Sequence, residues 1–114
     1  MPAAHRPETY SVIDHLHRAW NAHDLDALAA CFHPDSESLQ PLHPDRRLRG
    51  NWLVRISWGE IFRAVPDLRA ELLRCALAGD IAWTEWHWNG AYVDGHQFCA
   101  GGVMIFGLEA DRIV

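Results

Sequence analysis

The spacing of hydrophobic residues changes at Pro66-Asp67, and this change limits the folds open to the chain. Before it, apolar residues recur every three or four positions, as in an amphipathic helix; after it they alternate, as in a strand. The first part predicts helices over residues 8–21 and 52–64, with Asn51 as the cap of the latter, and a shorter helix between them that Asp24 caps. Three long strands are predicted after it, over residues 68–78, 81–92 and 96–107.

Turn residues separate the predicted strands. Gly79-Asp80 and Asp94-Gly95 lie where hairpin turns belong, so the strands should pair antiparallel. Residues 36–42 predict a short strand, and residues 112–114 the start of a last one. The layout is α+β: one domain over residues 1–114, with three N-terminal helices packed on a curved, mostly antiparallel sheet. A conical cavity between the two layers is the expected ligand site.

Composition excludes several classes of function. The formal net charge of −5 argues against a nucleic-acid surface. All cations are arginines, which excludes a Schiff-base lysine and, with the many alanines, indicates a GC-rich bacterial genome. No apolar run approaches the ~20 residues that span a membrane, and the N-terminal residues lack a signal-peptide layout. We therefore expect a cytoplasmic protein that contacts neither nucleic acid nor membrane.

The three cysteines, Cys31, Cys75 and Cys99, are far apart and match no zinc spacing. We expect reduced thiols, with Cys31 and Cys99 buried and inert. Glu85 and His87 share a strand face, but no third ligand has suitable spacing. Neither a metal nor another cofactor is therefore expected.

Residues 84–90 read TEWHWNG and combine titratable with aromatic side chains. Successive side chains of a strand point to opposite faces, so Glu85 and His87 face one way and Trp86 and Trp88 the other. Either pair could line the cavity, the first as an acid–base pair and the second as hydrophobic walls. Periodicity does not choose between them, because each face has apolar and polar members.

Several stretches together resemble a known family. They are AWNAHDLDALAACFHPD (19–35), RG before a helix (49–50), VPDLRAEL (65–72), GDIAWTEWHWNGAYVDG (79–95) and GGVMIFGLEADRIV (101–114). Their order is similar to that in SnoaL-like proteins of the nuclear-transport-factor-2-like (NTF2-like) superfamily, over nearly the whole chain. The resemblance implies a cone-shaped fold and a further strand after residue 114. It implies no single function, because the superfamily includes polyketide cyclases, ketosteroid isomerases, limonene-epoxide hydrolases, dehydratases and non-catalytic binding domains.

The catalytic sets of two related families do not carry over to this sequence. The three ketosteroid isomerase positions correspond to Gln40, Leu16 and Gly102, which offer neither a base near neutral pH nor an acidic donor. The arginine and aspartate of limonene-epoxide hydrolases correspond to Trp86 and Trp88. Neither reaction is therefore expected by the known route.

The resemblance implies that Trp86 and Trp88 face the cavity. Trp83, Glu85 and His87 then lie on the outer sheet face, where family members often dimerise, and Glu85 and His87 could pair there. We therefore expect a homodimer through this face. The predicted pocket-lining residues are Leu16, Trp20, Phe32, Gln40, Trp58, Phe62, Thr84, Trp86, Trp88, Phe98, Gly102 and Met104.

Three functional readings stay open. The first is a SnoaL-like enzyme of cyclase, isomerase or dehydratase type acting on a hydrophobic or aromatic molecule. Its acid or base would be an aspartate after residue 114, as the resemblance implies, or His33 or His43, which flank the short strand near the cavity mouth. The second is a non-catalytic binding module with the same pocket, whose aromatic walls could also hold a cation. The third is a dimerisation domain filled by its own tryptophans.

Overall fold

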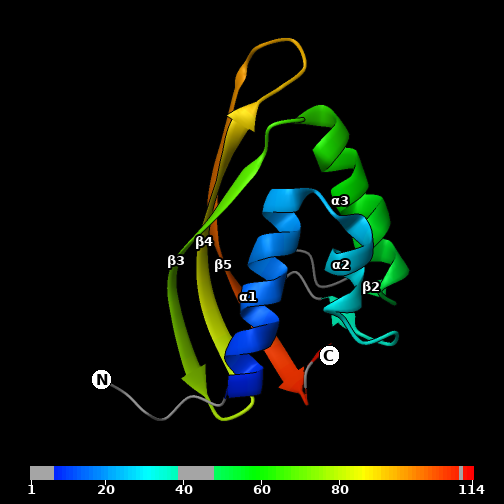
Figure 1. Ribbon diagram of the computed structural model, residues 1–114, viewed down its shortest axis with the longest axis vertical. Helices are drawn as coiled ribbons and strands as arrows, with labels where there is room; N and C mark the ends of the chain where they lie inside the picture. The colour runs from blue at the N-terminus through cyan, green and yellow to red at the C-terminus, as the bar shows by residue number, and fades with distance from the viewer. Residues whose placement is uncertain (1–6, 39–47, 111) are drawn as a thin grey trace.

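The computed structural model describes residues 7–38, 48–110 and 112–114, and it confirms the predicted α+β class. The helices are α1 (Pro7–Ala22), α2 (Leu25–Ala30) and α3 (Trp52–Ala64). The long strands are β3 (Arg69–Ala78), β4 (Ile81–Ala91) and β5 (Gln97–Glu109), and the short ones are β1 (Glu37–Ser38), β2 (Leu48–Arg49) and β6 (Arg112–Ile113). Figure 1 shows all three helices on one side of a curved sheet.

The main sheet is antiparallel throughout, in the order β3-β4-β5-β6. β1 and β2 form a separate two-stranded ladder. β6 holds the chain after α2 to the sheet: Ile113 forms a parallel bridge with Phe32, and its backbone bonds to Cys31 O and His33 N. The sheet and the second helix are thereby joined at one end of the molecule.

The two predicted helix caps behave differently. Asp24 caps α2 as predicted, because its backbone is extended and its carboxylate accepts from Ala27 N at 3.1 Å. Asn51 precedes α3 as predicted, but its side chain makes no cap hydrogen bond. Its backbone is already helical, so the amide turns elsewhere and donates to Phe32 O at 3.4 Å.

Side chains of α1, and that of His23 just after it, contact the edge strand β3 and the residue before it. Asn21 bonds both backbone groups of Ala70: its Oδ1 accepts from Ala70 N at 2.7 Å, and its Nδ2 donates to Ala70 O at 3.0 Å. The Nε2 atoms of His17 and His23 lie 2.9 and 2.8 Å from the carbonyl oxygens of Ala70 and Leu68. An edge strand otherwise leaves such groups unpaired, so these contacts fix α1 against the sheet.

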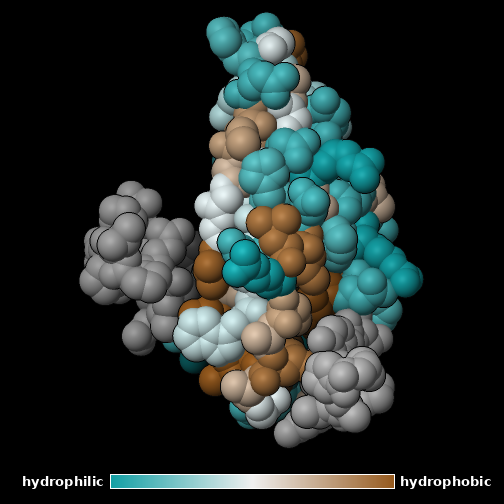
Figure 2. All heavy atoms as spheres, turned by 90° about the vertical axis from the view of Figure 1, so that its left-hand side faces the viewer, coloured by the Kyte–Doolittle hydropathy of each residue, from teal (hydrophilic) through white to brown (hydrophobic). Residues whose placement is uncertain are grey.

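The sheet face turned away from the helices carries an apolar patch. We call Ile81, Trp83, Val103 and Ile105 the outer patch; all four are exposed, Trp83 at 50% and Val103 at 63%. Trp83 lies directly opposite Ile105, and the other two flank this pair on β4 and β5. Figure 2 shows hydrophobic side chains gathered over the lower half of this face and hydrophilic ones over the upper half.

Two further findings concern the described residues alone. No helix among them is long and apolar enough to cross a membrane. Within the same residues, no group of three or more His, Cys, Asp or Glu side chains could hold a metal ion.

Gly90 tests how tightly the end of β4 packs on the turn before β3. A Cβ there would lie 2.6 Å from Val65 Cγ1, 2.8 Å from Asp67 Oδ1 and 3.3 Å from Leu68 Cα. We expect Gly90→Ala to lower the free energy of unfolding by about 1–3 kcal/mol, because the turn must shift. Gly102→Ala is the control, since its Cβ would meet nothing within 4 Å. Urea unfolding of both variants measures this, and equal stabilities would contradict the packing described.

Cys31 gives a stability prediction that depends on pH. Burial raises the pKa of its thiol from 9.0 to about 11, so the folded state disfavours the thiolate. The stability from this group is complete below pH 9.0 and is lost as pH rises toward about 11. In urea unfolding between about pH 8 and pH 11, the wild type should therefore lose more free energy of unfolding than Cys31→Ala. Parallel losses in the two proteins would contradict this.

Candidate functional site

Four tryptophans meet between the helices and the sheet, and we call them the tryptophan cluster: Trp20, Trp58, Trp86 and Trp88. Trp20 on α1 is central. Its ring centroid lies 4.6 Å from that of Trp86, 5.0 Å from that of Trp58 and 5.8 Å from that of Trp88. It meets Trp86 and Trp88 nearly edge-on, the geometry that the aromatic quadrupole favours.

The alternation of side chains along β4 brings two of these rings inward. Thr84 and Trp86 point inward and are buried, at 1% and 0% exposure. Trp83, the residue before Thr84, points to the other face and is half exposed. Trp88 shares the inward phase, and its ring stacks beside Trp86 at 6.1 Å and 18°. The tryptophans therefore face the helices, as expected, while Glu85 and His87 face outward.

The indole N–H groups of the cluster have unequal surroundings. Trp86 Nε1 donates to Thr84 Oγ1 at 2.7 Å, and Thr84 Oγ1 donates in turn to Met104 O at 2.7 Å. Thr84 is thus occupied by internal bonds. Trp20 Nε1 and Trp88 Nε1 are also buried, but neither has a hydrogen-bond partner among the described residues. A buried donor without a partner costs about 1–3 kcal/mol, so these two atoms are the exceptional feature of the cluster.

One side of the cluster is partly open to solvent. Trp58 and Trp88 are only half buried, and their centroids lie 6.1 Å apart with the ring planes at 40°. Phe62 continues the aromatic row beyond Trp58 and stacks on His23 with centroids 4.3 Å apart. His17 meets Trp86 edge-on at 5.6 Å. The sequence analysis did not single out these two imidazoles, because their contacts depend on how α1 docks.

Other predicted pocket residues have varied surroundings. Leu16 is fully buried in the core, and Phe32, Phe98 and Met104 are half buried against it. Gly102 is exposed, with open space where a side chain would be. Gln40 and His43 lie outside the described residues.

His33, a predicted acid or base, belongs to the turn after α2. Its Nδ1 accepts a hydrogen bond from Asp35 N at 3.0 Å, and its backbone N donates to Ile113 O at 2.7 Å. These contacts hold the imidazole to the turn. None of the contacts described for His33 is with the tryptophan cluster. A catalytic role for His33 stays a prediction.

Glu85 and His87, which the sequence allowed to pair with each other, have other partners. Glu85 Oε1 instead lies 3.3 Å from Arg74 Nε on β3, and His87 Nε2 lies 3.0 Å from Cys99 Sγ on β5. Residues two apart on a strand are separated by about 6.6 Å along it, so each side chain leans toward a neighbouring strand. The ion pair is solvent-exposed and therefore contributes little to stability.

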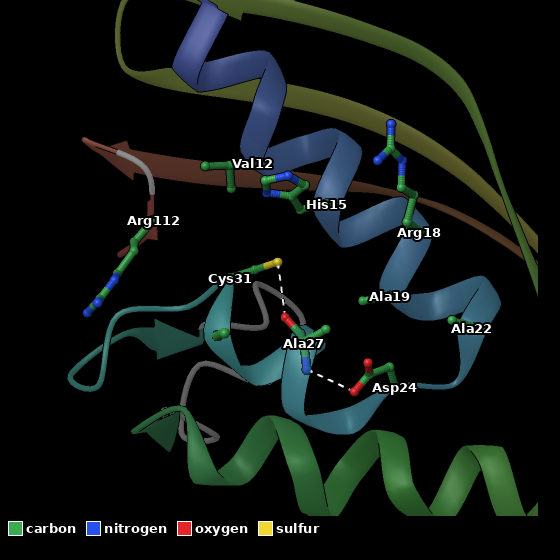
Figure 3. Close-up of a pocket in the computed structure, with 10 residues that line it drawn as sticks. Val12, His15, Arg18, Ala19, Ala22, Asp24, Ala27, Cys31 and Arg112 are labelled. Atoms are coloured by element: carbon green, nitrogen blue, oxygen red, sulfur yellow. Dashed lines mark hydrogen bonds between the residues drawn. The ribbon is translucent and has the colours of Figure 1, made fainter.

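Two hollows formed by described residues lie outside the cluster. A groove of about 600 Å³ runs between α1 and α2 (Figure 3), with Arg112 at one end, Arg18 toward the other, and His15 and Cys31 between them. A hollow of about 350 Å³ lies at the β3 edge beside His17. No predicted pocket residue lines either one. Among the described residues, the tryptophan rings point inward from both layers and contact one another between them.

Comparison with known proteins places this fold. A family model described as the SnoaL-like domain matches residues 12–114. A crystal structure of a candidate SnoaL-like polyketide cyclase from Jannaschia sp. CCS1 is 16% identical, with a TM-score of 0.80 over 99% of this chain and 87% of that one. No curated protein matches the chain in sequence.

Two other solved structures share the fold. A protein from Catenulispora acidiphila with a ketosteroid isomerase-like fold, in complex with trimethylamine, is 14% identical with a TM-score of 0.77, over 90% of this chain and 78% of that one. An LEH-like epoxide hydrolase from M. tuberculosis is 16% identical with a TM-score of 0.75, over 93% and 77%. These identities show a common fold and no more, whereas the family model spans most of the sequence. The chain therefore belongs to the SnoaL-like domain family and has its NTF2-like α+β fold.

Proposed function

We propose that this protein binds a flat, hydrophobic small molecule at the tryptophan cluster, and that Trp20 and Trp88 donate hydrogen bonds to it. The observation that carries the proposal is the pair of buried indole N–H groups without partners among the described residues. A ligand carbonyl or similar acceptor would pair them, at a net gain of about 1 kcal/mol for each bond. The aromatic rings would supply apolar contact for the rest of the molecule.

Entry would occur at the half-buried side of the cluster, between Trp58 on α3 and Trp88 on β4. The described rings contact one another, so a ligand that lies between them requires a ring to move. Trp58 is the better candidate to move, because its neighbours Ser57 and Arg55 on α3 are exposed, whereas Trp88 is fixed between paired strands. Binding by this route should therefore be sensitive to the side chain at position 58.

The trimethylamine complex of the Catenulispora acidiphila protein suggests a different ligand class. Ring faces attract ammonium groups, so four tryptophans could hold a methylated amine. The positive edge of an indole ring is its N–H side, however, and an unpaired N–H favours an acceptor over a cation. We therefore favour a neutral ligand with an acceptor atom.

Turnover is the second candidate function, with this chain as a SnoaL-like enzyme of cyclase, isomerase or dehydratase type. Membership of the family supports it. It needs an acid or base, for which His33 and His43 stay the predicted residues. Binding ranks first because His17, which meets Trp86, and His23, which stacks on Phe62 beside the cluster, already face backbone carbonyls through Nε2. Conversion of a bound ligand in many-fold excess over protein would favour the enzyme.

The binding proposal predicts a difference between two matched ligands, 1-indanone and indane, which differ by one carbonyl group. The wild type should bind 1-indanone more tightly, measured by calorimetry or tryptophan quenching. Trp88→Phe keeps an aromatic ring and removes the N–H, so it should weaken 1-indanone binding about 5- to 10-fold and leave indane unchanged. Trp83→Phe, on the outer face, is the control. Equal affinity of the wild type for both ligands would contradict the role of the indole donors.

We also propose that two copies associate through the outer patch and form the predicted homodimer. Its four apolar side chains adjoin one another on two paired strands, and contiguous exposed apolar surface on a monomer commonly marks an interface. A twofold axis would place the same patch on both sides, as in most homodimers. The ligand proposal does not depend on this one, because the cluster lies on the opposite face of the sheet.

Trp83→Glu should convert the dimer to a monomer, because it places a charge at the centre of the buried patch. Light scattering during size-exclusion chromatography should show the molar mass halved relative to the wild type. Trp52→Glu is the matched control: Trp52 is also an exposed tryptophan, but it lies on α3. A monomeric wild type, or the same shift in both variants, would contradict an interface at the outer patch.

A further inference from the structure

A thiol and an imidazole meet on the outer face of the sheet, away from the tryptophan cluster. Cys99 Sγ on β5 lies 3.0 Å from His87 Nε2 on β4, close enough for the thiol to donate to the ring nitrogen. Cys99 is exposed and His87 is half exposed. The pair can therefore be reached from solvent, and the proposed binding function does not use it.

The strand register explains why these two side chains meet. His87 lies directly opposite Gly101, and Cys99 lies opposite Asn89, so Cys99 and His87 are diagonal neighbours on one face. Gly101 has no side chain, so the imidazole is not obstructed on the β5 side. A built-in gap thus lets His87 lean toward Cys99.

The three cysteines of the chain differ in their surroundings. Cys31 is buried, its thiol donates to Ala27 O, and burial raises its pKa to about 11. Burial also raises the pKa of the half-buried Cys75 thiol. The expectation that Cys99 is buried was wrong: it shares the outward phase of Glu85 and His87. Only Cys99 combines exposure with a nitrogen base among these three described thiols.

We propose that Cys99 is a nucleophilic site for α,β-unsaturated carbonyl compounds, with His87 as its base. His87 Nε2 takes the thiol proton, and the thiolate Sγ attacks the β-carbon to form a C–S bond. The electron pair of the C=C bond moves to the α-carbon, which then takes the proton back from the imidazolium. No leaving group, oxidant or reductant is needed, and addition asks only for a base that can return its proton.

The thiol site lies on the same sheet face as the outer patch, and His87 is a diagonal neighbour of Val103 across the β4–β5 ladder. Cys99 precedes Val103, a patch residue, by four positions on β5, which corresponds to about 13 Å along the strand. The site lies on the opposite face from the tryptophan cluster, so its function and the proposed ligand binding can fail independently.

N-ethylmaleimide, itself an α,β-unsaturated carbonyl compound, is the probe. The folded protein is treated near neutral pH, quenched at intervals and digested, and peptide mass spectrometry follows each cysteine. Cys99 should react first, with Cys31 and Cys75 as internal references. His87→Ala should slow the addition at Cys99 at least tenfold, the lower range of what a positioned base contributes. His87→Gln, which keeps a polar side chain without a base, should slow it similarly.

Asn89→Ala is the matched control, because Asn89 is the exposed residue directly opposite Cys99 and carries no base. It should react like the wild type, and circular dichroism should show each variant folded. Unchanged rates in both His87 variants would overturn the proposal by showing that Cys99 is merely exposed. An equal loss in Asn89→Ala would overturn it by assigning the effect to strand packing, as would faster reaction at Cys31 or Cys75.

Discussion

The contact between Trp20 and Trp86 joins the helical layer to the sheet, and much of the structure depends on it. Both side chains are fully buried, and their rings meet nearly perpendicular at 4.6 Å. Such a pair contributes about 0.5–1.5 kcal/mol beyond the burial of its apolar area. The next residue on α1, Asn21, bonds both backbone groups of Ala70. Packing and hydrogen bonds therefore set the same separation between α1 and the sheet.

This separation also explains why the tryptophans are packed rather than spread around an open cone. A structural domain filled by its own tryptophans would account for the burial of the rings. It would not account for two indole N–H groups that have no partner among the described residues, since natural interiors pair nearly all buried donors. Thr84 shows that this sheet can satisfy an indole when it carries a suitable acceptor, as it does for Trp86. These two donors thus favour a ligand-binding site over a purely structural role for the tryptophans.

Much of the fold could be predicted because it depends on local patterns. The change of period at Pro66-Asp67 and the hairpin turns fix the order of elements, and alternation along β4 fixes which face carries the tryptophans. Contacts distant in sequence could not be predicted. His17 and His23 contact backbone carbonyls 53 and 45 positions away in the sequence. Cys99 could be placed only by the alternation of side chains along its strand, not by its hydrophobic type. Whether inward rings leave a cavity depends on how closely the layers pack, which the pattern does not encode.

One strand, β4, separates the two chemistries proposed for this protein. Its inward side chains, Trp86 and Trp88, belong to the cluster, and its outward ones, Trp83 and His87, belong to the patch and the thiol site. A one-residue slip in register would exchange these faces, burying a charge and exposing two large rings. The inward hydrogen bond from Trp86 to Thr84, and from there to Met104 on β5, opposes such a slip. The buried hydrogen bond from Trp86 Nε1 to Thr84 therefore also helps to keep His87 beside Cys99 on the surface.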